Sequence, residues 1–146
     1  MKIAVASDHA GFAYKERLRE LLHQVGNEVQ DYGAYSEESS DYPDFAILAA
    51  RAVARGEADC GILICGSGIG MSIVANKVPG VRAANCCTEE MARLSRQHNN
   101  ANVLTFGARL LPFEQAWRMV QVFLETSFEG GRHERRVGKI HKLTER

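Results

Sequence analysis

The sequence predicts an α/β protein: a Rossmann-like, three-layer sandwich in which helices cover both faces of a five-stranded parallel sheet. Three observations lead to this class. Short apolar segments alternate along the chain with longer segments whose apolar residues recur at helical spacing. The segment Cys60–Cys65 is apolar on both faces, as expected of a central parallel strand. Five expected strands alternate with helices, which predicts parallel pairing with right-handed crossovers.

The elements follow from local patterns. We expect strands at residues 3–6, 28–31, 60–65, 81–87 and 103–106. The expected helices cover residues 14–25, 45–53, 72–76, 91–95, 113–124 and 132–141. Glycines at 26 and 56 are placed to end the first two helices, Thr88 to cap the fourth, and Gly130-Gly131 to interrupt the fifth. Residues 32–43 are polar, contain Gly and Ser, and are expected to form a loop.

Composition and charge exclude several classes of function. The 146 residues suit a single domain spanning 1–146, and 45% of them are hydrophobic, which is enough for a buried core. Eighteen basic residues balance eighteen acidic ones, which argues against electrostatic binding to nucleic acid or to acidic membranes. No apolar run approaches the roughly 20 residues of a membrane span, and the N-terminus does not resemble a signal peptide. We therefore expect a cytoplasmic protein without nucleic-acid or membrane partners.

The four cysteines do not predict a metal site. They form no CxxC pair, and no histidine has the spacing of a zinc finger. Cys60, Cys86 and Cys87 lie in apolar segments and are interpreted as small buried hydrophobic residues. Cys65 differs because it stands at the end of the central strand, where a ligand site is expected.

Parallel sheets bind ligands at the carboxyl ends of their strands. Asp8 and His9 follow the first strand, and an acid beside an imidazole can act on the hydroxyls or ring oxygen of a sugar. The alternative is that Asp8 only caps the helix that follows.

A glycine-rich loop, Cys65-Gly-Ser-Gly-Ile-Gly-Met-Ser, follows the third strand. Its alternate glycines let the backbone approach a ligand and direct amides at an anion. Met71 stands where the dinucleotide fingerprint requires Gly and where the thiol phosphatase loop requires Arg, and the P-loop frame is also absent. A cysteine beside such amides favours the thiolate, which suits attack on a carbonyl or removal of a proton next to one. The alternative is a buried cysteine that merely ends the strand.

Four further residues are candidates. His98 lies in a segment expected between the fourth helix and the fifth strand, and an imidazole there can act as acid or base. Arg132 and Arg136 lie four residues apart on one face of the last helix and can bind a phosphate together. Arg109, just after the fifth strand, is another phosphate ligand. The alternatives are a solvated loop histidine and a solvated basic face.

These residues occur in six short motifs that follow one another in a fixed order. They are Ser-Asp-His-Ala-Gly from residue 7, Asp-Tyr-Pro from 41, Gly-Ile-Leu-Ile-Cys-Gly-Ser-Gly-Ile-Gly from 61, Ala-Asn-Lys from 75, Ser-Arg-Gln-His-Asn from 95, and Glu-Gly-Gly-Arg-His from 129. The chain resembles, nearly end to end, the ribose-5-phosphate isomerase type B family, which also holds allose- and galactose-6-phosphate isomerases.

The resemblance implies an activity and an assembly. The reaction is the interconversion of D-ribose 5-phosphate and D-ribulose 5-phosphate through an enediolate, in the pentose phosphate pathway, without a metal or another cofactor. The enzyme would be a homodimer, possibly a tetramer, with active sites at the subunit interface, where the basic helix at residues 132–141 would pack.

The resemblance also implies a role for each site residue. Cys65 would be the base that moves the proton between C2 and C1, and Ser67 would handle the hydroxyl protons. The backbone amides from Gly66 to Gly70, including those of Gly68 and Ile69, would stabilise the enediolate. Asp8 and His98 would assist ring opening. Sugar would bind to Tyr42 and Asn99, and phosphate to His9, Arg109, Arg132 and Arg136.

Two departures from the family pattern concern the site. Many relatives have Thr where this chain has Ser67, a change that keeps the hydroxyl. Some relatives use a glutamate base at the position of Met71; since Met71 cannot accept a proton, the chain resembles the branch with a cysteine base. Two rival functions stay open: a hexose 6-phosphate isomerase, for example for allose 6-phosphate, and a sugar-phosphate-binding module in which Cys65 is inert.

Overall fold

The computed structural model describes residues 1–146 and contains five strands and six helices. The strands are β1 (Lys2–Ser7), β2 (Glu28–Asp31), β3 (Cys60–Cys65), β4 (Ala83–Asn85) and β5 (Val103–Gly107). The helices are α1 (Phe12–Gln24), α2 (Tyr42–Ala54), α3 (Ile69–Ala75), α4 (Glu89–Asn99), α5 (Phe113–Glu125) and α6 (Arg132–Thr144). Every neighbouring pair of strands is parallel, in the order β2-β1-β3-β5-β4.

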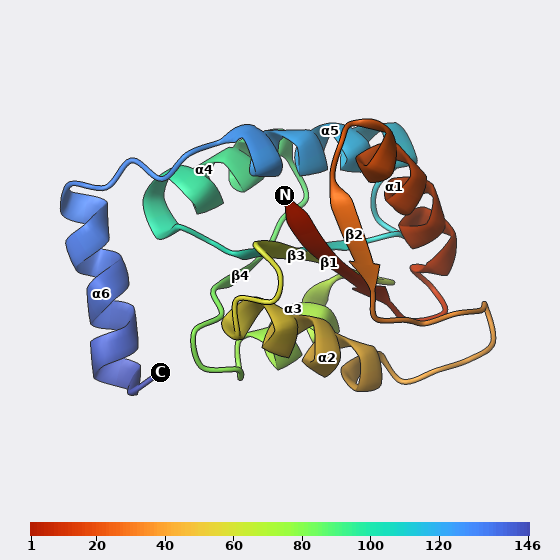
Figure 1. Ribbon diagram of the computed structural model, residues 1–146, viewed down its shortest axis with the longest axis horizontal. Coiled ribbons are helices and arrows are strands. Elements are labelled where there is room, and N and C mark those ends of the chain that lie inside the picture. Colours follow the sequence, from red (N-terminus) through yellow and green to blue (C-terminus); the bar gives the residue numbers. More distant parts are fainter.

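Helices cover both faces of this sheet, so the predicted three-layer α/β class is confirmed. Figure 1 shows α1, α4 and α5 over one face and α2 and α3 over the other. The last helix, α6, stands apart at the margin of the molecule, beside β4 (Figure 1). None of the helices combines the length and the apolar character that spanning a membrane requires.

The two faces of the sheet are packed differently. Toward α1 and α5 the strands present large side chains such as Val5 and Phe106, whereas toward α2 they present small ones such as Ala4. The facing side of α2 is itself rich in fully buried alanines, including Ala46 and Ala49. Because small side chains let a helix approach a sheet closely, α2 can bring its first residues near the loop that follows β3.

Several boundaries differ from the sequence-based expectation. Tyr42 and Pro43, expected in the loop, form the first turn of α2, where proline is favoured because its fixed φ suits a helix and no N–H is needed. Strand β4 spans only Ala83–Asn85 instead of residues 81–87, since it is an edge strand that pairs with β5 alone. Helix α5 ends at Glu125, before Gly130-Gly131, because Thr126 already adopts extended backbone. Helix α6 continues past residue 141 to Thr144.

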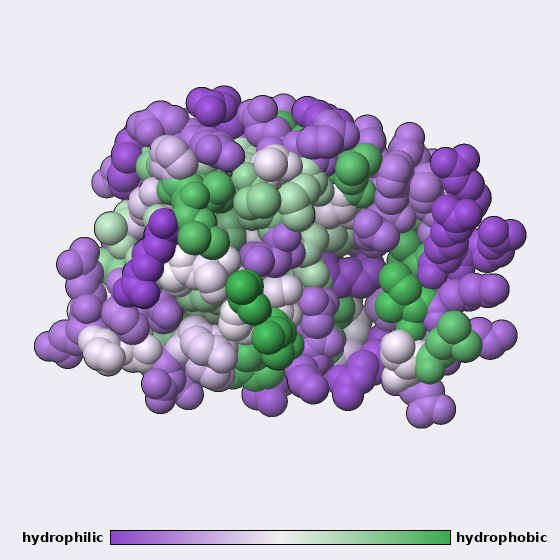
Figure 2. Space-filling view, turned by 180° about the vertical axis from the view of Figure 1, so that it is seen from behind, coloured by the Kyte–Doolittle hydropathy of each residue, from purple (hydrophilic) through white to green (hydrophobic).

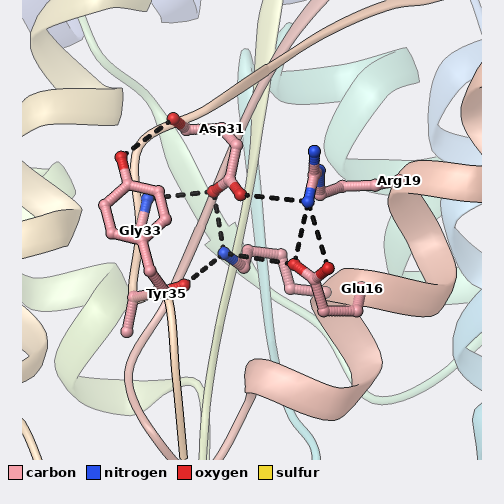
Figure 3. A network of polar contacts seen from close by, with 7 residues as sticks. Glu16, Arg19, Asp31, Gly33 and Tyr35 are labelled. Carbon is pink, nitrogen blue, oxygen red and sulfur yellow. Dashed lines mark hydrogen bonds and ion pairs between the residues drawn. The ribbon is translucent and has the colours of Figure 1, made fainter.

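A buried ion pair links α1 to the segment after β2. Lys15 of α1 is fully buried, and its Nζ donates to Asp31 Oδ1 at 2.7 Å and to the Ala34 carbonyl. Asp31 Oδ2 also lies 3.4 Å from Nη1 of the more exposed Arg19. Figure 3 shows Asp31 at the centre of this network, with the Gly33 amide donating to it at 2.9 Å.

The same network supports the carboxyl end of β1. The Ser7 amide donates to the Gly33 carbonyl, and the Ala34 amide donates to the Ser7 carbonyl, each at 2.6 Å. The buried lysine therefore holds the strand end from which Asp8 and His9 follow.

We predict that Asp31→Ala lowers the free energy of unfolding by about 3–5 kcal/mol, because it leaves the Lys15 ammonium buried without its closest carboxylate. Urea unfolding followed by circular dichroism measures the change. Arg19→Ala, which removes the half-exposed partner, is the control and should cost less than about 1 kcal/mol. Equal losses in the two variants would contradict the prediction.

Candidate active site

A cleft opens where the carboxyl ends of β1, β3 and β5 meet. In the sheet register Ser7 lies opposite Ile64 and Cys65 opposite Gly107, so the three strands end at one level. The cleft has a volume of about 570 Å³. It is lined by Asp8, Tyr42, Cys65, Gly66, Ser67, Ile69, Gly70, Ile73, Arg109 and Leu110. We call it the carboxyl-edge cleft.

The loop after β3 turns back over the Cys65 thiol. The Gly68 amide points at the sulfur, with 3.1 Å between N and Sγ, and Cys65 is only 4% exposed. Gly68 has a φ of +80°, and a Cβ there would lie 2.2 Å from Asn85 Oδ1, so only glycine fits. Asn85 is itself held by the Thr105 hydroxyl at 2.9 Å. The loop thus holds a backbone donor in a fixed place against the Cys65 sulfur.

Two other glycines let side chains close over the loop. A Cβ at Gly70 would lie 2.6 Å from the Tyr42 ring, and one at Gly66 would lie 3.3 Å from Arg109 Nη1. Tyr42 from α2 and Arg109 from the segment after β5 therefore lie directly against the glycine loop. Ser67 stands between these contacts, and its Oγ accepts the Ile69 amide at 3.3 Å.

Asp8 has a structural role and also lines the cleft. Its Oδ1 accepts the amides of Ala10 and Gly11, at 3.0 and 3.2 Å, and so shapes the turn before α1. The N-cap position itself is Gly11. Asp8 Oδ2 accepts no hydrogen bond from the protein, so the carboxylate keeps one oxygen for a ligand. The alternative drawn from the sequence, that Asp8 only caps the following helix, is wrong, because Gly11 holds the N-cap position and no side chain caps α1.

His9 is oriented by the loop before α2. Its Nδ1 accepts the Ser40 amide at 3.2 Å, while its own amide donates to Ser40 Oγ at 3.1 Å. With Nδ1 acting as an acceptor, the neutral ring carries its proton on Nε2. This nitrogen is then a hydrogen-bond donor available to an anion.

The other predicted site residues lie elsewhere in the chain. His98, expected in a loop, is in the last turn of α4 together with Asn99, and Arg132 and Arg136 belong to α6. Asn99 lines a different groove, of about 720 Å³, between α6 and the segment around α3 and β4. Since α4 leads into the start of β5, whereas Cys65 pairs with the end of β5, none of these four residues lines the carboxyl-edge cleft of its own chain.

His98 belongs to a second cluster of polar groups. Its Nε2 lies 3.4 Å from Glu129 Oε1, and His133 Nε2 lies 3.8 Å from the same oxygen. The two imidazole rings stack with 4.2 Å between their centroids. Desolvation lowers the pKa of His133 below its ordinary value, and the positive charges of His98 and Arg132 lower it further. Glu129 and His133 were given no role from the sequence, because only the folded chain brings them to His98.

The remaining cysteines separate into two groups. Burial raises the pKa of Cys60 to about 12 and that of Cys86 to about 11, so both behave as the buried hydrophobic residues that the sequence suggested. Cys87 was wrongly included with them: it is exposed, because β4 ends at Asn85 and the chain then turns outward toward α4.

Comparisons with known proteins agree on one family. The sequence matches the family described as Ribose/Galactose Isomerase over residues 3–140. It is 48% identical to ribose-5-phosphate isomerase B of Escherichia coli strain K12 over 145 residues, covering 99% of this chain and 97% of that protein. The structure of ribose-5-phosphate isomerase B from Clostridium thermocellum matches with a TM-score of 0.98 at 49% identity, covering 99% and 98% of the two chains.

A third relative is known as a complex with a sugar phosphate. It is ribose-5-phosphate isomerase B from Mycoplasma genitalium with bound ribulose-5-phosphate, which matches with a TM-score of 0.95 at 44% identity and covers 99% of this chain and 96% of its own. The resemblance read from the six motifs is therefore confirmed, and this chain belongs to the ribose/galactose isomerase family.

Proposed function

We propose that this chain is an aldose–ketose isomerase that interconverts D-ribose 5-phosphate and D-ribulose 5-phosphate, a reaction of the pentose phosphate pathway in the cytoplasm. The observation that carries the proposal is the Cys65 thiol at the carboxyl-edge cleft, with the Gly68 amide directed at its sulfur. The names of the relatives, and the ribulose-5-phosphate described with one of them, support the choice of a pentose phosphate.

The proton transfer uses groups that the cleft already holds. The Cys65 thiolate takes the proton from C2 of the open-chain aldose, and the electron pair moves into an enediolate. Amides of the loop from Gly66 to Gly70 stabilise the charge that develops, each well-directed donor contributing about 3–4 kcal/mol. Cys65 then returns the proton to C1, while Ser67 moves a proton between the two hydroxyl oxygens. The sugar gains and loses no atoms or electrons in the cycle.

Ring opening and substrate binding need groups from both ends of the sheet. We propose that Asp8 and His98 assist ring opening and that Tyr42 and Asn99 bind the sugar. The phosphate would be bound by His9, Arg109, Arg132 and Arg136. Since His98, Asn99 and α6 do not line the carboxyl-edge cleft of their own chain, a second copy would supply them. The proposed assembly is therefore a homodimer with shared sites.

The surface of the chain supports this assembly. Figure 2 shows a hollow between α6 and the body of the molecule, with apolar side chains on both sides of it. The hollow is lined by residues that include Ile73 and Ile140, which are 57% and 43% exposed. Ile73 also lines the carboxyl-edge cleft, so a copy seated in this hollow would lie next to the cleft. Apolar patches of this kind are typical of protein interfaces.

The first test is the formation of ribulose 5-phosphate from ribose 5-phosphate with EDTA present. Turnover supports the proposal. If the purified chain turns over allose 6-phosphate but not the pentose phosphate, the rival hexose function is correct. Binding of both sugar phosphates without turnover would instead support a binding module.

The proposed mechanism requires no metal, so we predict that prolonged treatment with EDTA leaves kcat and KM unchanged. The measurement compares treated enzyme, dialysed against metal-free buffer, with untreated enzyme. Loss of activity that returns on adding a divalent cation would contradict the proposed chemistry.

We predict that Arg132→Ala raises KM for the phosphorylated sugar by about 10- to 100-fold, the effect of losing one charge-assisted hydrogen bond, and lowers kcat less. Steady-state kinetics separate the two constants. Arg135→Ala, an exposed neighbour on α6 that is outside the proposed phosphate site, is the matched control. An unchanged KM would remove Arg132 from that site.

A further inference from the structure

The segment between α5 and α6 brings Glu129 and His133 to the end of α4, where His98 lies. The Gly130-Gly131 pair has φ values of +70° and +57°, so the chain turns there in a conformation that favours glycine. Before this turn, the Glu129 amide donates to the Gln97 carbonyl at 3.1 Å, which fixes the segment against α4. After the turn, His133 belongs to the first turn of α6. The backbone therefore places a carboxylate and a second imidazole beside His98.

The two imidazoles form a stacked pair with the carboxylate at one edge. Their ring centroids lie 4.2 Å apart, and their planes differ by only 9°. His133 is buried, so it gives the more exposed ring of His98 a fixed surface to pack against. Glu129 Oε1 lies 3.4 Å from Nε2 of His98 and 3.8 Å from Nε2 of His133, so both rings turn the same nitrogen toward the carboxylate. The stack sets the plane of the His98 ring, and Glu129 sets its rotation within that plane.

Glu129 also decides which nitrogen of His98 carries the proton. A carboxylate attracts an N–H group, and since it faces Nε2, the neutral ring keeps its proton there. No hydrogen bond within the chain involves Nδ1 of His98, whose lone pair is then left for a ligand. In this arrangement a carboxylate orients a general base and stabilises the imidazolium that forms when the base takes a proton.

The charges around the two rings explain why such a base needs a carboxylate. Burial is the largest cause that lowers the pKa of His133, and the charges of His98, Arg132 and Arg136 lower it further. The same arginines disfavour an imidazolium on the stacked ring of His98. Glu129 is the only carboxylate that pairs with either ring, so it offsets them at close range.

We propose that Glu129 and His133 are positioning residues that make Nδ1 of His98 the proton carrier of ring opening. The proposal rests on the proposed function, in which His98 acts in the adjoining subunit's cleft. Nδ1 takes the proton of the anomeric hydroxyl, whose oxygen forms the C1 carbonyl while the bond between C1 and the ring oxygen breaks. The imidazolium, stabilised by Glu129, returns the proton to the ring oxygen, which becomes the C4 hydroxyl. One nitrogen can serve both oxygens because both are bonded to C1, and no proton or electron is gained or lost.

The place of the proton is tested without reference to activity. The full-length chain is labelled with ¹⁵N, and the ring nitrogens of His98 are assigned by comparison with His98→Ala. At a pH where the ring is neutral, the nitrogen shifts should show the proton on Nε2. Glu129→Ala should move these signals, whereas Glu134→Ala, at an exposed residue of the same turn of α6, is the control and should not. A proton on Nδ1, or signals that Glu129→Ala leaves in place, would overturn the proposal.

The kinetic test compares a sugar that must open with sugars that cannot close. Ribose 5-phosphate forms a five-membered ring through its C4 hydroxyl, whereas in D-erythrose 4-phosphate that oxygen carries the phosphate. Glu129→Ala should lower kcat/KM for ribose 5-phosphate by at least about tenfold, a part of the roughly 10²–10⁴-fold that a general acid or base contributes. Turnover of the tetrose phosphate should stay nearly unchanged. Exchange of the C1 proton of ribulose 5-phosphate with D₂O, which also starts from an open chain, should likewise be kept.

Further variants separate the possible failures. Glu129→Gln keeps an acceptor oxygen and should recover part of the loss, and sedimentation verifies that each variant forms the same assembly as the unchanged chain. Equal losses with cyclic and open-chain sugars in Glu129→Ala would overturn its positioning role. Equal losses in His98→Ala would instead show that His98 does not act in ring opening, which contradicts the proposed function itself. If the chain shows no isomerase activity at all, the nitrogen shifts still decide whether Glu129 positions the His98 ring.

Discussion

Replacement of Cys65 by alanine is expected to lower kcat for ribose 5-phosphate by about 10³-fold or more, within the range attributed to a general base, while the protein stays folded. Cys65 is the proposed base, and its sulfur is the side-chain atom at which the Gly68 amide of the loop is directed. The substitution removes a single buried sulfur, which we expect to cost about 1 kcal/mol of stability. Ribulose 5-phosphate formation and thermal unfolding followed by circular dichroism measure the two effects.

Cys60→Ala is a matched control for this experiment. Cys60 lies at the opposite end of the same strand, is 5% exposed, and has a pKa raised to about 12 by burial. The two substitutions remove the same atom from β3, so they should have similar effects on stability, but only Cys65→Ala should abolish turnover. Loss of the fold in Cys65→Ala, with Cys60→Ala unaffected, would return Cys65 to the role of a buried core residue.

The second large effect concerns two inactive variants mixed together. Cys65→Ala and His98→Ala should each be nearly inactive, but subunits unfolded and refolded together should regain about one quarter of the unchanged enzyme's activity. The reason is that each proposed site combines Cys65 of one subunit with His98 of the other. In a mixed dimer, one site would therefore contain the intact Cys65 of the His98→Ala subunit and the intact His98 of the Cys65→Ala subunit. If subunits pair at random, half of the dimers are mixed, and each mixed dimer has one intact site of its two. One quarter of all sites would therefore be active.

A mixture of Cys65→Ala with Cys65→Ser is the control, since every site in it lacks the thiol and none can recover. Sedimentation of the refolded mixture verifies that dimers have formed. If the first mixture forms dimers and stays as inactive as the control, His98 does not act in the other subunit's cleft, and the shared-site assembly is wrong.

Much of the fold could be predicted because it depends on local patterns. The fully apolar segment from Cys60 to Cys65 and the alternation of strands with helices led to the parallel sheet that the structure contains. Thr88 caps α4 through the Met91 amide, as its position suggested, because a cap involves only neighbouring residues. The errors occurred at element ends, where tertiary packing decides: the local pattern of residues 81–87 cannot show that β4 is an edge strand of three residues.

The sequence by itself also determined which residues could carry chemistry, since strand ends and glycine spacing are visible in one dimension. It could not determine their grouping. Register and crossover topology place Asp8, Cys65 and Arg109 in one cleft, and His98 with Glu129 and His133 in a separate cluster of side chains. Only the tertiary structure shows that these groups lie at opposite ends of β5, because the distance between residues depends on the direction of the strands, not on their separation along the chain.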